Sequence, residues 1–214
     1  VEYDVYPHKD FFFIRYKDKE NLNGKIYQVA KSDYANRAAW KEMVAHNKDV
    51  RIENLNVQKE YIVIETRKNG LTEMEIRSLV TGKSRFVSFP EPVYNAYSSG
   101  NPEYDAATFR YSYTSLNRPT TLYEYDCTNG HTSLLKQQEI PSGFKPDDYE
   151  VERLWATAAD GVKVPMSVVY KKGLKKNGTN PALLYAYGSY GMSMDVFFSS
   201  AFYSLIDRGF VFGI

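Results

Sequence analysis

The chain has 214 residues, which is enough for one or two domains. Its 27 basic and 26 acidic residues leave a formal net charge of +1, so charge gives no reason to expect nucleic acid or an anionic membrane as the main partner. The single cysteine, Cys127, excludes an internal disulfide and indicates a buried or half-exposed thiol in a reducing compartment. We therefore expect a cytoplasmic protein, and no apolar run approaches the ~20 residues that a membrane span requires.

The first two thirds of the chain repeat a pattern of strand candidates. Aromatic residues make up 15% of the chain and favour pleated, half-buried surfaces. Each repeat starts with a short candidate (residues 2–6, 51–57 and 94–98), followed by three further strands. The second strands cover residues 11–16, 61–66 and 108–113, the third 25–29, 74–79 and 121–126, and the fourth 40–45, 84–89 and 132–138.

This period indicates β-propeller blades. Four strands every 45–50 residues or so are typical of a blade, and turn signals at Ser32-Asp33, Thr81-Gly82 and Asn129-Gly130 close the third strand of each repeat. We predict about three blades over residues 1–145. Three blades do not close a ring, so further blades are expected elsewhere in the protein. The alternative is a β-sandwich with irregular strands, which would not require the period.

The pattern changes near residue 145, after a Pro/Gly/Asp-rich stretch at residues 141–148. Residues 149–158 and 162–171 flank Asp160-Gly161 and predict a hairpin. Residues 182–187 form a nearly continuous apolar strand, which we expect to be buried on both faces. A helix over residues 196–207 is expected to end with Gly209 at its C′ position, and residues 210–214 start another strand. This strand–helix–strand order predicts the start of an α/β domain over residues 146–214.

Neither end of the sequence has the character of a natural terminus. A strand candidate begins almost at Val1, and the last residues stop within an apolar run that ends at Ile214. Natural termini are usually polar and poorly ordered. We therefore expect this chain to be an internal piece of a longer polypeptide, whose remainder would be its first partner.

Long motifs in the second half resemble the prolyl oligopeptidase family of serine peptidases, in particular its oligopeptidase B branch. They are LLYAYGSYGMSMDVFFSS followed by LIDRGFVF, YEVERLWATAADGVKVPMSVVY, and TFRYSYTSLNRPTTLYEYD. The resemblance is strongest after Tyr104, whereas the first hundred residues share pattern more than motif. It implies all-β propeller blades followed by the start of an α/β-hydrolase domain, and cleavage of short basic peptides after Lys or Arg without a cofactor or metal.

The family's catalytic Ser, Asp and His lie in the hydrolase domain, with the serine in a G-x-S-x-G elbow. No such elbow occurs in this sequence, and Gly188-Ser189 does not fit it. By the family's order the triad should follow Ile214, so we expect the chain to be inactive alone. A histidine of the triad would not lie in the blades, which leaves His8, His46 and His131 as loop or exposed residues.

The resemblance implies two site residues. The tyrosine at the position of Tyr187 donates its hydroxyl to the oxyanion of the tetrahedral intermediate, although the residues alone would favour a packed aromatic. A carboxylate at the position of Asp195 helps to bind a basic side chain next to the cleaved residue. Some relatives have a second acid two positions later, where this chain has Phe197. Asp195 could also cap the helix that follows it.

A second class of function fits part of the pattern. A propeller without catalysis could act as a binding module, with the α/β segment as an appendage. The sequence beyond Ile214 would separate the two, since an elbow serine followed by Asp and His would indicate the enzyme.

Overall fold

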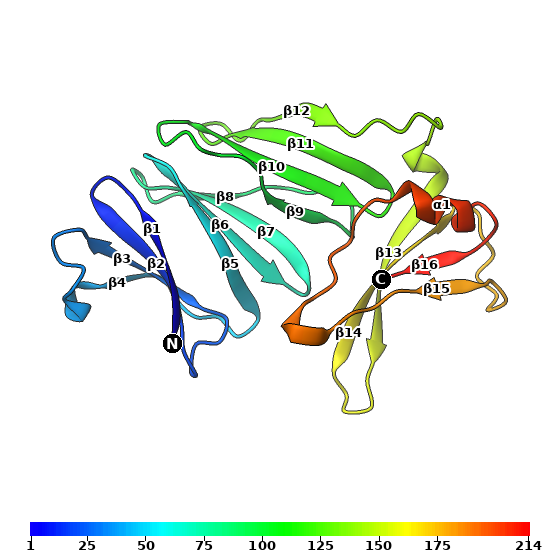
Figure 1. The fold of residues 1–214 in the computed structure, drawn as a ribbon, viewed down its shortest axis with the longest axis horizontal. Helices are drawn as coiled ribbons and strands as arrows, with labels where there is room; N and C mark the ends of the chain where they lie inside the picture. Colours follow the sequence, from blue (N-terminus) through cyan, green and yellow to red (C-terminus); the bar gives the residue numbers. More distant parts are fainter. The chain divides into compact units, whose positions relative to one another are not determined.

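The structure is a computed structural model that describes residues 1–214, and its strands form four sheets of four strands each. In the first three sheets, strands that follow one another in the chain are also neighbours in the sheet (Figure 1). The first contains β1 (Glu2–Pro7), β2 (Phe11–Lys17), β3 (Lys25–Ala30) and β4 (Lys41–Val44). The second contains β5 (Val50–Val57), β6 (Tyr61–Lys68), β7 (Leu71–Ser78) and β8 (Ser84–Phe86). The third contains β9 (Asn95–Ser98), β10 (Thr108–Ser115), β11 (Arg118–Asp126) and β12 (Thr132–Gln137).

These twelve strands are the twelve that the repeat predicts, and the pairs in the first two sheets are antiparallel. Residues 61–66 and 108–113 lie in β6 and β10, as a blade requires. The strand prediction for residues 1 to about 140 is therefore confirmed. A short helical turn, Arg37–Ala39, interrupts the loop between β3 and β4.

The fourth sheet contains β13 (Tyr149–Thr157), β14 (Lys163–Lys171), β15 (Ala182–Leu184) and β16 (Val211–Gly213), in the order β13-β14-β16-β15. β13 and β14 form the hairpin that Asp160-Gly161 predicts, with Gly161 at a φ of +84°. β15 and β16 run parallel, which confirms the expected change of pairing after residue 180. Short helical turns at Pro146–Asp148 and Ser189–Gly191 and one helix, α1 (Ser200–Ile206), complete the chain.

Two expectations for this region are wrong. Residues 182–187 are not buried on both faces, since β15 is only three residues long, and Leu184 is 61% exposed. The reason is that β15 is the edge strand, while α1 packs against β14 and β16. The helix begins at Ser200 and not at residue 196, because Val196 and Phe198 are buried in a segment that continues in extended form to Ser199.

The end of α1 agrees with the sequence. Gly209 has a φ of +92°, its N–H donates to Ile206 O at 3.0 Å, and the Phe210 N–H donates to Leu205 O at 3.3 Å. This pair of hydrogen bonds is the Schellman arrangement, in which glycine at C′ avoids the steric penalty of a left-handed backbone. None of the helices has the length and hydropathy that a membrane-spanning helix requires.

The chain divides into two compact units, and the division runs through the third sheet. The first unit contains Val1–Val87, Ser98–Arg110 and Glu124–Thr132; the second contains Ser88–Tyr97, Tyr111–Tyr123 and Ser133–Ile214. These units are not the two predicted domains, and the domain boundary predicted at residue 145 stays a prediction.

The core of the first unit lies between the first two sheets. It consists of Phe13, Ile26, Ile52, Leu55, Ile62 and Ile64, each at most 4% exposed. Ile52 and Leu55 are three residues apart in β5 and would point to opposite faces of a regular strand. A bulge between Ile52 and Asn54 restores their common face, because it adds one residue to β5.

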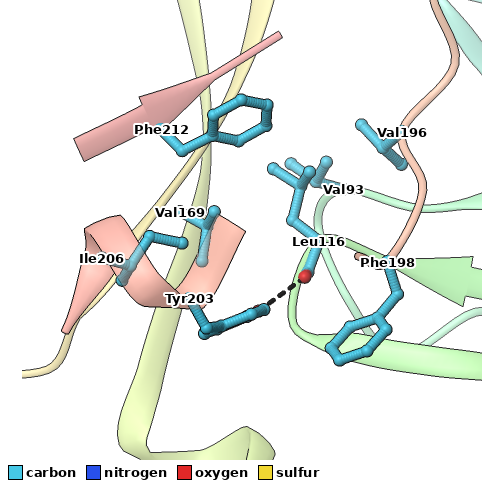
Figure 2. Close-up of a cluster of buried hydrophobic side chains, with 8 residues drawn as sticks. All are labelled: Val93, Leu116, Val169, Val196, Phe198, Tyr203, Ile206 and Phe212. Atoms are coloured by element: carbon cyan, nitrogen blue, oxygen red, sulfur yellow. Dashed lines mark hydrogen bonds between the residues drawn. The ribbon is translucent and has the colours of Figure 1, made fainter. Parts of the chain in front are cut away.

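The core of the second unit joins the β10–β11 turn to the fourth sheet and α1. Its buried residues are Val93, Leu116, Val169, Val196, Phe198, Tyr203, Ile206 and Phe212 (Figure 2). Phe144 and Tyr149 extend it, with ring centroids 4.6 Å and 4.5 Å from that of Tyr203. This core positions the segment between β15 and α1, which carries both predicted site residues.

Candidate functional site

Tyr187 lies three residues beyond the end of β15. The Tyr185 N–H donates to Gly213 O at 2.8 Å and so continues the pairing with β16 by one residue. Because β15 and β16 are parallel, their carboxyl ends lie at the same edge of the sheet, the edge at which open α/β sheets bind ligands. The Tyr187 side chain is 45% exposed, so its phenol is accessible to a ligand at that edge.

The next residues form a strained turn. Tyr190 has a φ of +58° and Gly191 a φ of +68°, within the helical turn Ser189–Gly191. A left-handed backbone is costly for a bulky residue such as tyrosine, and such residues are common near functional sites. The Tyr190 side chain is 95% exposed, so burial of its ring does not offset this cost.

Asp195 is partly buried and directly precedes Val196, which is only 4% exposed. Its interpretation as the helix N-cap is wrong, because the N-cap position is Ser199. Val196 and Phe198 are buried while Phe197 between them is 39% exposed, which is the alternation of an extended segment. Asp195 is thus held at the start of a strand-like segment fixed by the core.

Two buried hydrogen bonds attach the segment after Asp195 and the helix α1 to the end of β10 and the turn that follows it. The Phe198 N–H donates to Thr114 Oγ1 at 3.2 Å. The Tyr203 hydroxyl donates to Leu116 O at 2.6 Å, the bond drawn as a dashed line in Figure 2. Neither Thr114 nor Tyr203 was predicted from the sequence. Tyr203 could have been found from its spacing of three to Ile206, whereas nothing local marks Thr114.

The three histidines and the single cysteine show no arrangement that points to catalysis. His8 is 9% exposed; its Nε2 lies 3.0 Å from Lys59 O, its Nδ1 accepts from the Asp10 N–H at 3.3 Å, and its ring contacts Phe11, Phe13 and Tyr104. His46 is partly exposed and His131 exposed. Cys127 is 5% exposed, and burial raises the pKa of its thiol to about 12, so the thiolate needed for nucleophilic chemistry is disfavoured.

Comparisons with known proteins agree along the whole chain. Dipeptidyl aminopeptidase BI of Pseudoxanthomonas mexicana is 39% identical over 215 residues, which cover 100% of this chain and 29% of that protein. Protease 2 of Moraxella lacunata is 29% identical over 212 residues, which cover 99% of this chain and 30% of that protein.

Solved structures give the same result. Oligopeptidase B from Leishmania major superimposes with a TM-score of 0.90 at 32% identity, covering 100% of this chain and 31% of that one. Oligopeptidase B from Trypanosoma brucei, with covalently bound antipain, gives a TM-score of 0.90 at 30% identity and covers 31% of that chain. This chain therefore spans about three tenths of the length of the relatives it matches.

The family assignment rests on the blades. The family model described as "Prolyl oligopeptidase, N-terminal beta-propeller domain" matches residues 1–138, which is more than half of the chain. The three four-stranded sheets are the structural counterpart of that match. The chain belongs to the prolyl oligopeptidase family.

Proposed function

We propose that the chain is part of a serine oligopeptidase, with residues 1–145 as propeller blades and residues 146–214 as the first part of its α/β-hydrolase domain. The observation that carries the proposal is the similarity to oligopeptidase B over the whole chain, at 32% identity and a TM-score of 0.90. The parallel pair β15 and β16 supports the hydrolase assignment. The triad Ser, Asp and His would come from the remainder of the polypeptide.

In this function Tyr187 stabilises the oxyanion of the tetrahedral intermediate. Its position after the carboxyl end of β15 suits the role, because the main chain of Tyr185 is held by Gly213 while the Tyr187 phenol stays accessible. A donor that is fixed in advance stabilises charge that appears only in the transition state. Such a donor increases the catalytic constant more than it tightens substrate binding.

Asp195 supplies substrate selection in the same proposal. Cleavage follows Lys or Arg, and the Asp195 carboxylate binds a basic side chain next to the cleaved residue. Position 197 is Phe and supplies no second carboxylate. Of positions 195 and 197, only Asp195 can therefore contribute to a preference for paired basic residues. Short basic peptides are therefore the proposed substrates.

A second candidate activity is the removal of dipeptides from a free amino terminus. The observation that favours it is the 39% identity to a dipeptidyl aminopeptidase along the full chain. The two activities differ in one measurable property, since only the exopeptidase requires an unblocked amino terminus. Peptides of identical sequence with free and blocked amino termini therefore separate them.

The test of the oxyanion role is steady-state kinetics of Tyr187→Phe in the full-length protein. We expect a fall in kcat on the order of a hundredfold, the usual loss for one oxyanion donor, with a smaller change in KM. Tyr185→Phe is the matched control, because that side chain lies two residues earlier and is similarly exposed, at 47%. An unchanged kcat in Tyr187→Phe would contradict the oxyanion role.

Asp195→Asn tests substrate selection with two peptides that have Arg at the cleaved position and Arg or Gly before it. We expect KM to rise for the Arg-Arg peptide and to stay constant for the Gly-Arg peptide. An equal effect on both peptides would contradict a role in binding the basic neighbour.

A further inference from the structure

The end of β10, where the chain turns into β11, fixes the segment that follows Asp195. Thr114 is 4% exposed, and its Oγ1 accepts the buried hydrogen bond from the Phe198 N–H at 3.2 Å. The same hydroxyl lies 3.0 Å from Arg118 O, to which it donates across the turn. Thr114 therefore joins the turn to residues 84 positions later in the chain through one hydroxyl.

The turn itself is held from several directions. Ser115 Oγ donates to Val93 O at 2.6 Å in a buried hydrogen bond. Arg118 pairs with Glu91 at 2.7 Å and with Asp147 at 3.1 Å. The acceptor that Thr114 offers to Phe198 thus lies at the end of β10, beside a turn that is tied to the chain before β9 and to the stretch that leads into β13.

Asp195 lies where the exposed and the fixed parts of its segment meet. Tyr187 and Tyr190, before it, are 45% and 95% exposed, whereas Val196 and Phe198, after it, are 4% and 7% exposed. The position of the Asp195 main chain is therefore held by the buried residues that follow it, Val196 and Phe198. In this part of the segment, the Phe198 N–H donates a buried hydrogen bond to Thr114.

We propose that Thr114 is a positioning residue for substrate selection, because its hydroxyl fixes residues 196–198 and thereby the carboxylate of Asp195. The proposal rests on the proposed function, in which Asp195 binds the basic neighbour of the cleaved residue. Misplacement by about 1 Å is enough to weaken a charge-assisted contact of this kind. Thr114 is only 4% exposed and is not placed to meet a substrate directly, so turnover of substrates without a basic neighbour should be independent of its hydroxyl.

The direct test is hydrogen exchange at the Phe198 amide in the full-length protein. Thr114→Val keeps the shape of the side chain and removes the hydroxyl, whereas Thr114→Ser keeps the hydroxyl and is the matched control. Loss of the acceptor leaves a buried N–H unpaired, so we expect exchange in Thr114→Val to accelerate on the order of tenfold. Equal exchange in the two variants would overturn the contact itself.

The functional test measures KM and kcat for the Arg-Arg and Gly-Arg peptides. In Thr114→Val we expect KM for the Arg-Arg peptide to rise about fivefold, the effect of one ordinary hydrogen bond, with kcat unchanged for both peptides and Thr114→Ser close to the parent. An equal loss on both peptides indicates a general structural role and overturns the proposal.

Asp195→Asn, measured in parallel, separates the two levels of inference. If it removes the preference for the Arg-Arg peptide while Thr114→Val leaves it intact, Asp195 binds the substrate and the positioning role of Thr114 is wrong. If Asp195→Asn has no effect on the preference, the proposed function of Asp195 fails and the role of Thr114 fails with it.

Discussion

Removal of the Tyr203 hydroxyl tests how far the core of the second unit depends on one buried hydrogen bond. Tyr203 is 6% exposed, and its hydroxyl donates at 2.6 Å to the carbonyl of Leu116, which is 1% exposed. Its ring also packs against Phe144, Tyr149 and Phe198. Tyr203→Phe keeps these ring contacts, so the variant isolates the hydrogen bond.

The size of the effect follows from the burial of both partners. A hydrogen bond contributes about 1 kcal/mol net, but a buried group left without its partner costs roughly 1–3 kcal/mol. Water cannot replace the hydroxyl in a closed aromatic core, and burial already raises the pKa of Tyr203 above its usual value. We therefore expect Tyr203→Phe to lower the local unfolding free energy of α1 by about 2 kcal/mol, or roughly thirtyfold faster exchange of its amides.

The assay is native-state hydrogen exchange at the Asp207 amide, which donates to Tyr203 O at 3.0 Å at the end of α1. Tyr149→Phe is the control, because its hydroxyl donates to Asp207 Oδ1 at 2.9 Å in an exposed hydrogen bond that water can replace. The control should change exchange by less than about fivefold. An effect of Tyr203→Phe no larger than that of the control would refute the reasoning from burial.

Two further predictions concern the isolated chain and its tyrosines. Expressed alone, the chain should bind hydrophobic dyes or aggregate, because Tyr3, Leu184 and Tyr185 are 64%, 61% and 47% exposed; a sharp, reversible, monomeric unfolding transition would contradict this. It should also fail to hydrolyse peptides after Lys or Arg, because the proposed triad belongs to the remainder of the polypeptide, and turnover by the isolated chain would contradict that. Burial, followed by hydrogen bonds to carboxylates, raises the pKa of both Tyr149 and Tyr170 to about 12. Because the unfolded phenols lose their protons near pH 10, the stability due to these groups is complete below that pH and is lost between about pH 10 and pH 12. In the full-length protein, urea midpoints across this range should fall less in Tyr149→Phe and Tyr170→Phe than in the parent, and parallel curves would contradict the shifts.

Strand patterns were readable from the sequence because alternation and turns are local properties. Residues 61–66 predicted β6, and the structure extends it to Lys68, where Asn69 and Gly70 turn the chain at φ of +51° and +75°. Asn-Gly is the residue pair that favours such a turn, so this signal was available in the sequence and would have given the end of the strand.

The start of α1 was not readable in the same way. Phe198, Phe202 and Ile206 have helical spacing, while Val196 and Phe198 have the spacing of a strand, and both patterns fit a short apolar run. Contacts with residues far away in the sequence decide between helix and strand, since the Phe198 N–H hydrogen-bonds to Thr114 and its ring shares a core with Leu116 and Tyr203. Composition likewise identified 182–187 as apolar but could not identify which of its neighbours would cover it.

The candidate site residues likewise divide into those that sequence could suggest and those that only the structure could identify. Tyr187 and Asp195 could be named only from the resemblance to a family, because an exposed tyrosine after a strand and a carboxylate before a helix have many ordinary explanations. What the structure adds is the difference between them: Tyr187 follows a sheet edge, whereas Asp195 adjoins the buried Val196. Thr114 could be identified only from the structure, because its partner Phe198 is 84 residues away in the sequence.

The packing of the second unit links the last blade to the residues that follow it. Val93, which precedes β9, and Leu116, in the β10–β11 turn, share one core with Tyr203 and Ile206 in α1. A change at the β10–β11 turn therefore alters the same set of contacts as a change in α1, although the predicted boundary near residue 145 would separate them in the sequence. Because Asp195 adjoins this core through Val196, the stability of the third blade and the position of a proposed substrate-binding carboxylate are two consequences of the same packing.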